Sequence, residues 1–306
     1  SWYRTHNFRL NSEFNITKKH TLTLGGQLYY SPNWKARNTT NSDVLNASDI
    51  IQSSFSTLNQ SENFTKNLGL DATYDWQLSE KEKLSVSGHI TDYIKTGEQE
   101  VKTDFFDIDK IFTNNSTFET ITEQTTKIYN SQLDYENKFN ESSKFETGFK
   151  YATISSMSDL KHYNLINNQL EIDNTKSNIF AYDEDNISGY LSYQSSFGKL
   201  NLKAGLRGEY TSLTGNSATL NQINKNNYFK LFPTFYVQYS PNEKNQLSFT
   251  YGKRISRPNY SSLNPFKFYF SDYSFYEGNP GLKPAVTQNI ELQYTFKQKY
   301  NFDIYY

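Results

Sequence analysis

Apolar and polar residues alternate through most of this chain, and the alternation limits the possible folds more than any other feature. In one segment the apolar residues fall on every second position and the positions between them are polar. The apolar positions are Leu200, Leu202, Ala204, Leu206 and Tyr210, and the polar ones are Asn201, Lys203, Arg207 and Glu209. Segments 20–30, 230–239 and 289–297 repeat the pattern. A period of two with one apolar face predicts half-buried β-strands.

The connections between these strands alternate in length. Short polar turns are predicted at 17–20, 79–82, 140–143, 198–199 and 241–244. Long loops are predicted near 31–63, 95–125, 155–185, 212–227 and 256–284. Strict alternation places all the long loops on one side of an antiparallel sheet. Outer-membrane β-barrels have this asymmetry, with short periplasmic turns and long external loops.

Aromatic residues favour the same fold. They recur on the apolar face at both ends of the strands, as expected for two girdles at the membrane interfaces. The first girdle, near the short turns, comprises Trp76, Phe139, Phe197, Tyr239 and Phe296, and the second comprises Tyr30, Tyr151, Tyr210 and Tyr251. We therefore predict an all-β fold, an antiparallel transmembrane barrel of about twelve strands, an even number that such barrels allow.

The composition agrees with a barrel. Only 35% of the residues are hydrophobic and the mean hydropathy is -0.79, yet 17% are aromatic. A barrel resolves this conflict because only its lipid face must be apolar, whereas a packed soluble domain usually has about 45–50% apolar residues. A soluble β-sandwich that binds glycans through aromatic loops stays open as an alternative.

One block of the sequence is more specific. Arg254-Ile-Ser-Arg-Pro-Asn-Tyr-Ser-Ser-Leu-Asn-Pro-Phe266 is followed by Gly278-Asn-Pro-Gly-Leu-Lys-Pro284 and Asn289-Ile-Glu-Leu-Gln-Tyr294. These residues resemble a segment of the outer-membrane β-barrel family related to TonB-dependent receptors, in the form common in Bacteroidetes. The resemblance covers 254–294 only.

The resemblance implies a location in the bacterial outer membrane, contact with membrane lipids and receptor-like import of a solute. It also implies a barrel of about 22 strands, a plug domain and a periplasmic energy-coupling protein. No plug or coupling segment lies within 1–306, so we expect one barrel domain over 1–306 that is truncated at both ends. A non-transporting barrel scaffold that docks a surface lipoprotein or a secretion component is the alternative.

The loop at 256–284 is the best candidate for binding. Its aromatic residues are too many for a solvated loop and must be buried against something, while its Pro and Gly residues suit tight turns. The candidate ligand-binding residues are Arg254, Arg257, Tyr260, Phe268, Tyr273, Tyr276 and Glu277. A role of this block in holding the fold competes with ligand contact and is the favoured interpretation.

Other chemistry finds little support in the sequence. No nucleophile motif accompanies the four His residues, so no catalytic residue is assigned. The chain has no Cys, and the acidic clusters at 104–109 and 183–185 lack the spacing of calcium loops. We therefore expect neither a metal nor a cofactor. The net charge is -1 and no basic stripe is present, so a nucleic-acid partner is not expected.

Overall fold

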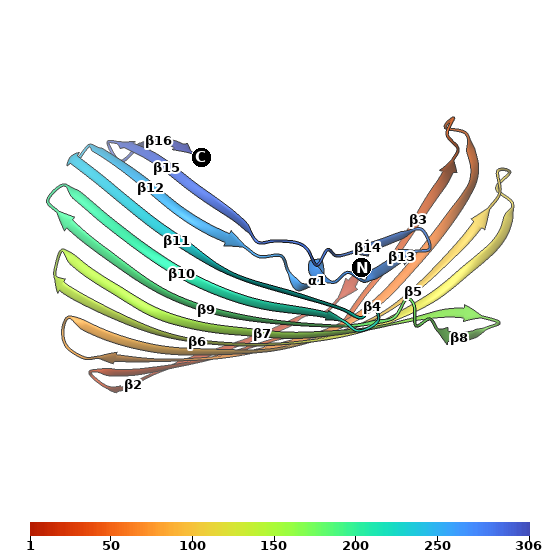
Figure 1. The fold of residues 1–306 in the computed structure, drawn as a ribbon, viewed down its shortest axis with the longest axis horizontal. Coiled ribbons are helices and arrows are strands. Elements are labelled where there is room, and N and C mark those ends of the chain that lie inside the picture. The colour runs from red at the N-terminus through yellow and green to blue at the C-terminus, as the bar shows by residue number, and fades with distance from the viewer.

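The computed structural model describes residues 1–306 and consists almost entirely of β-strands, which lie side by side as one curved sheet (Figure 1). The long strands are β2 (His6–Thr17), β3 (His20–Leu45), β4 (Ile51–Gln77), β5 (Glu82–Phe106), β6 (Phe112–Asn140), β7 (Ser143–Ile166), β9 (Asn178–Phe197), β10 (Leu200–Ser217), β11 (Gln222–Asn242), β12 (Asn245–Ser256) and β15 (Ala285–Phe296). The shorter elements are β1 (Trp2–Tyr3), β8 (Gln169–Ile172), β13 (Lys267–Ser271), β14 (Ser274–Glu277), β16 (Tyr300–Tyr305) and the helical turn α1 (Tyr260–Leu263). No helix has the length and apolar character needed to cross a membrane.

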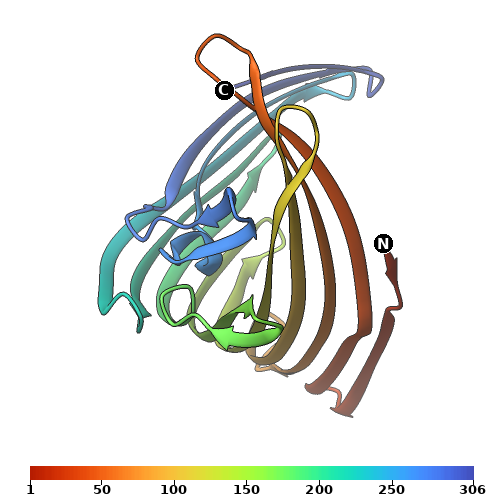
Figure 2. The same ribbon diagram turned by 90° about the vertical axis from the view of Figure 1, so that its right-hand side faces the viewer.

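Every pair of neighbouring strands is antiparallel, as the sequence predicts. The order is β1-β3-β4-β5-β6-β7-β9-β10-β11-β12-β15-β16, with β2 also paired to β3 and β8 to β7. This path contains twelve of the fourteen strands of the sheet, close to the expected number of about twelve. Its two end strands do not pair with each other, so the sheet is a deep trough with a concave and a convex face (Figure 2).

The short turns lie where they are predicted. Each joins two paired strands, and the five turns lie together at one end of the sheet (Figure 1). One of the two-residue turns is Gly198-Lys199 between β9 and β10, where Gly198 has a φ of 59°. Glycine adopts this left-handed conformation without the steric cost that a side chain would bring. The turn therefore fixes the register of β9 and β10.

The predicted long loops differ from the structure. In four of the five segments the chain continues as paired strand, and only short turns such as 46–50 and 107–111 interrupt it. The turns are closed by side chains, since Asn46 Oδ1 accepts from the Ser48 and Ile50 amides and Asp107 Oδ1 from those of Asp109 and Ile111. Extending the ladder pairs backbone groups that a loop would leave to water. Only 256–284 leaves the sheet.

The two faces of the sheet have opposite polarity. On the convex face large apolar side chains are exposed, with Leu191 at 51% and Leu206 at 41%. On the concave face the covered residues are mainly polar, and of the buried side chains seventeen are polar or charged against seven hydrophobic. A water-soluble sandwich would have the reverse arrangement. The convex face is therefore built to contact lipid and the concave face to contact water.

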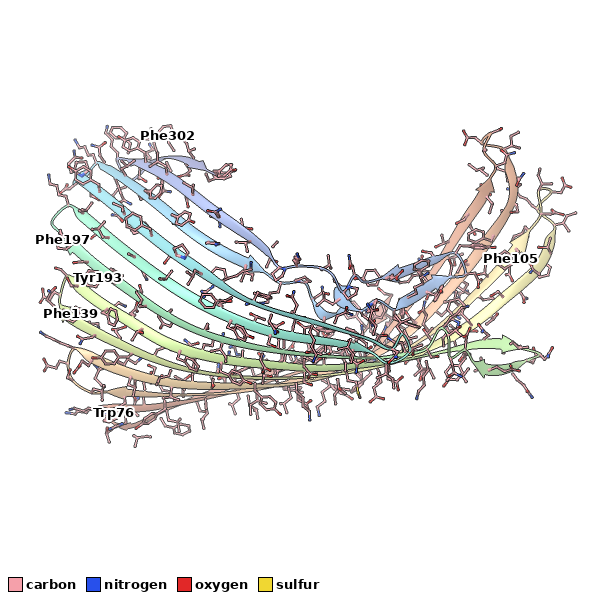
Figure 3. All side chains as sticks on the ribbon, in the orientation of Figure 1. Trp76, Phe105, Phe139, Tyr193, Phe197 and Phe302 are labelled. Atoms are coloured by element: carbon pink, nitrogen blue, oxygen red, sulfur yellow. The ribbon has the colours of Figure 1, made fainter.

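Cross-strand rows of apolar and aromatic residues mark the limits of the lipid face. The lower row follows the register Phe197, Leu200, Tyr239, Leu247, Tyr294 and Phe302, and Figure 3 shows Phe197, Phe139 and Trp76 near the short turns. The upper row follows Tyr151, Ile187, Tyr210 and Phe229. On β10 the rows are ten residues apart, or about 33 Å of strand. At a tilt of ~40° this gives ~25 Å, the height of the apolar band of a membrane barrel.

We predict that an arginine on the convex face is costly and one on the concave face is not. Leu206 lies midway between the rows, whereas Thr234 lies at nearly the same height on the concave face, since it pairs with Gly205. Leu206→Arg should destabilise folding into bilayers by about 2–4 kcal/mol, because the charge enters hydrocarbon. Thr234→Arg should change it by less than about 1 kcal/mol. Urea titrations in lipid vesicles measure both, and equal losses would contradict the assignment of the faces.

Candidate functional site on the concave face

The segment between β12 and β15, residues 257–284, folds onto the concave face of the sheet; we call it the inner loop. It contains α1 and the two-stranded sheet β13-β14. Figure 2 shows these elements inside the trough and not beyond its rim. The expectation that the aromatic side chains of this loop are buried is met only in part. Phe266 is buried and Tyr260, Phe268 and Tyr269 are half-buried, whereas the four aromatic residues from Phe270 to Tyr276 are exposed.

Hydrogen bonds within the inner loop fix its shape. Asn259 Oδ1 accepts from the Ser262 amide at 2.9 Å and so caps the N-terminus of α1. At the other end of the loop, the Gly278 amide donates to the Asn264 carbonyl at 2.9 Å and the Asn279 amide donates to the Ser262 carbonyl at 2.7 Å. A Cβ on residue 278 would lie 2.4 Å from the Asn264 carbonyl oxygen, so only glycine allows this approach. These two hydrogen bonds therefore join the first part of the motif block, 254–266, to its second part, 278–284.

An ion-pair cluster anchors the start of the inner loop. Arg257 Nη2 lies 2.6 Å from Glu209 Oε2 on β10, and Arg257 Nε lies 3.6 Å from Glu184 Oε1 on β9. Arg257 also donates to the Tyr228 hydroxyl at 3.2 Å. Burial works to lower the pKa of Arg257, but the hydrogen bonds to Glu209 and Tyr228 outweigh burial and raise it above its ordinary value. The guanidinium is therefore fully charged and held by the wall.

A small apolar core lies beside this cluster. Leu263 of α1 packs with Phe180 and Tyr182 of β9, and the three are at most 5% exposed. Tyr260 packs against the same core, and its hydroxyl accepts a hydrogen bond from Gln124 on β6. These contacts join α1 to β6 and β9, which lie on either side of β7 in the sheet.

The tip of the β13-β14 hairpin reaches the opposite part of the wall. The Tyr273 ring lies 5.0 Å from that of Phe55 on β4 and 6.1 Å from that of Phe105 on β5, between ring centroids. Ser116 Oγ on β6 donates to Asp272 Oδ1 at 3.1 Å. The inner loop therefore crosses the trough from β12 to β4, a span that covers most of the concave face.

A cavity of about 270 Å³ lies between the hairpin and the wall. Phe268 and Phe270 of β13 form its inner side, while β4, β5 and β6 form its floor. The floor side chains are mainly neutral amides and hydroxyls, among them Asn59, Ser61, Asn63, Gln99, Thr122 and Gln124. It is a polar cavity with one aromatic side, an arrangement that can hold a polar solute.

Comparison with models of known protein families shows the family of this chain. A family model described as "Outer membrane protein beta-barrel family" matches residues 76–306. The chain belongs to this family. The match extends far beyond the motif block at 254–294, so it reflects the whole pattern of strands and turns. The protein therefore lies in the bacterial outer membrane, with the apolar convex face against lipid.

Solved structures agree with the fold. The chain is similar to the ferric citrate transporter FecA in the unliganded form, with a TM-score of 0.57 and 12% identity, over 99% of this chain and 51% of that one. The copper transporter OprC gives 0.49 and 11%, over 99% and 53%. The siderophore receptor PiuA from Acinetobacter baumannii gives 0.45 and 10%, over 95% and 52%. A search of the curated proteins found no match.

The likeness to FecA supports the barrel architecture. The expected outer-membrane β-barrel family is confirmed. At 12% identity the likeness to FecA shows the fold alone, and the chain spans about half the length of the structures it matches. The type common in Bacteroidetes stays a prediction.

In this member of the barrel family the seven predicted binding residues do not form one site. Arg257 and Tyr260 are held by the wall, and Tyr273 packs at the hairpin tip. Phe268 lines the cavity. Arg254, Tyr276 and Glu277 are exposed, and of these Tyr276 donates weakly to Ser262 Oγ at 3.4 Å while Arg254 has no ion pair. The motif residues thus mainly shape the inner loop.

The sequence did not point to the floor of the cavity. Asn59, Asn63, Gln99, Thr122 and Gln124 stand in no motif. The sequence signal that could have found them is the alternation of side chains along each strand. Every second residue of β4, β5 and β6 lies on the concave face, together with the buried Thr57, Val101 and Thr120. That they lie under β13 depends on how the inner loop folds, and the alternation along the strands does not predict that fold.

We predict that Gly278 is required for the closed inner loop. Gly278→Ala forces its Cβ against a backbone carbonyl, and such overpacking typically costs about 1–3 kcal/mol. The matched control is Gly281→Ala, where the Cβ would lie 3.1 Å from the movable Asn279 side chain. Limited proteolysis at Lys267 should be faster in the first variant only. Equal protection of both variants would contradict the role of Gly278.

The Arg257 cluster supports a second prediction. Arg257→Ala removes the only cation paired with Glu184 and leaves Glu209 paired with Arg207 alone. It should destabilise the protein by about 1–2 kcal/mol, less than the loss of a fully buried pair, because the arginine is partly exposed and Glu209 keeps one partner. The control Arg254→Ala removes an exposed cation without an ion pair and should cost under about 0.5 kcal/mol. Urea unfolding of both variants gives the comparison. A loss in Arg254→Ala as large as that in Arg257→Ala would refute it.

Proposed function

We propose that the protein is the wall and inner loop of an outer-membrane receptor that imports a solute by a TonB-dependent mechanism, and that it is not an enzyme. The observation that carries the proposal is the polar cavity between the inner loop and the wall. It opens on the water-facing side of a sheet whose other side faces lipid. A receptor needs this arrangement, because a solute must be held inside the barrel and not on its surface.

The geometry of the inner loop supports import further. The loop is anchored at β9 and β10 through Arg257 and touches β4 and β5 through Tyr273. A solute in the cavity would therefore contact wall and loop together. In this proposal a plug domain fills the remaining lumen, a periplasmic energy-coupling protein acts on the plug, and the long hairpins stand on the external side.

The exposed aromatic rings of the hairpin support the alternative of a docking scaffold. Phe270, Tyr273, Phe275 and Tyr276 are 44–67% exposed on an element of only eleven residues. Such a patch suits contact with another protein, either a plug within the receptor or a surface lipoprotein on a non-transporting barrel. Purification of the full-length protein in mild detergent separates these, since only the scaffold requires a co-purifying lipoprotein.

Import predicts that cells remove a solute from the medium through this protein. Cells that make the full-length receptor and cells that lack it are grown in a complex medium, and the spent media are compared by mass spectrometry. At least one solute should be depleted several-fold faster with the receptor, and a protonophore should abolish the difference. The Gly278→Ala variant should be impaired and Gly281→Ala should not. Identical spent media would refute import and favour the scaffold.

A further inference from the structure

The cavity under β13 has a chemistry that narrows the class of its ligand. Charged side chains are few among its lining residues: Lys95 is the one cation, and Glu98 is the one acid. An anionic iron chelate or a phosphate ester needs several cations or Arg forks, and a metal ion needs grouped carboxylates. An apolar ligand would leave the amides of the floor unpaired. The lining therefore favours a neutral, strongly hydrogen-bonding ligand.

The floor offers hydrogen-bonding groups that the protein does not use. Gln99 is 9% exposed, its Oε1 accepts from Thr120 at 3.1 Å, and its amide NH₂ has no protein partner. The side chains of Ser61, Asn63 and Thr122 also line the cavity and make no hydrogen bond to the protein. Together they present both donors and acceptors. This mixture matches hydroxyl groups, each of which donates and accepts.

Gly97 makes room for one of the polar side chains on the floor of the cavity. The Asn63 side chain lies over Gly97, because a Cβ at residue 97 would be 2.6 Å from Asn63 Oδ1. Gly97 pairs directly with Asn63 in the register of β4 and β5. The missing side chain thus leaves room for the Asn63 amide over residue 97. A side chain at residue 97 would displace this amide from the floor of the cavity.

The opposite side of the cavity is aromatic. The Phe268 and Phe270 rings lie 5.3 Å apart between centroids at an interplanar angle of 71°. The two rings therefore lie at a steep angle to each other, and both line the cavity. The face of a phenyl ring carries negative partial charge, so it attracts the weakly positive C–H groups of a flat polyol ring. Polar floor and aromatic side together fit a ligand with hydroxyls on its rim and C–H groups on its face.

We propose that this cavity binds one ring of a neutral saccharide, with its hydroxyls on Asn63, Gln99 and Thr122 and its C–H face on Phe268. The volume of about 270 Å³ is just below the range of about 300–1,000 Å³ for complete small-molecule sites, so the site holds one ring while the rest of an oligosaccharide extends into the trough. This proposal rests on the proposed import function only in that import would bring the saccharide to this cavity. Binding itself can be measured without import.

The test uses the purified full-length protein in detergent, probed with an array of neutral oligosaccharides and, separately, with ferric citrate as an anionic probe. At least one neutral glycan should bind. Asn63→Ala and Phe268→Ala should each weaken that binding by about tenfold, the effect of losing one or two good contacts. The control Phe275→Ala lies on the same hairpin, but its ring packs on Tyr269 outside the cavity, and should change the affinity less than threefold.

The outcomes separate the two proposals. No binding to any neutral glycan, binding of ferric citrate alone, or equal weakening by Phe268→Ala and Phe275→Ala would overturn the saccharide site. Circular dichroism and heat-modifiable migration on gels confirm that each variant is folded. Saccharide binding without uptake by cells would leave the site standing and refute import alone.

Discussion

The pairing of backbone groups within the sheet is the constraint on which the rest of this structure depends. Of 223 backbone hydrogen bonds, 200 lie within strands and the helical turn. Lipid offers no partner for an unpaired N–H or C=O, so a chain that crosses it as strands must pair them all in the ladder. Once the ladder is complete, side chains are free to differ on the two faces. The apolar convex face and the polar concave face follow from this freedom.

The inner loop shows how such a wall gains a binding surface. The loop is a weak element by itself, with a four-residue helix and an eleven-residue hairpin. It is held because Arg257 pairs with Glu209, Leu263 packs on Phe180, and the Tyr273 ring packs on Phe55. Since the contacts lie at its ends and base, the middle of the loop spans the wall without filling the space beneath. The cavity is a consequence of that span.

The residues that fix the fold of the inner loop thus differ from the residues that line the cavity. Gly278, Asn259 and Arg257 belong to the block that resembles the family, and each fixes the fold of the loop. Asn63, Gln99 and Thr122, which carry the hydrogen-bonding chemistry of the cavity, are ordinary strand residues. Residues that shape the loop are recognisable because tight turns admit few residue types. Residues that contact a solute are not recognisable in this way, since a strand accepts any polar residue at a position that faces the concave side.

The sequence by itself determined the strand faces, the positions of the short turns and the family. Period-two alternation and turn chemistry are local properties, so Leu206 and Gly198 reveal their roles from their immediate neighbours. Only the tertiary structure decided that four predicted loops continue as paired strands, that the inner loop turns into the trough, and that Arg257 meets Glu209, 48 residues away. Those contacts depend on the register and curvature of the whole sheet, which bring distant residues together and which no local pattern encodes.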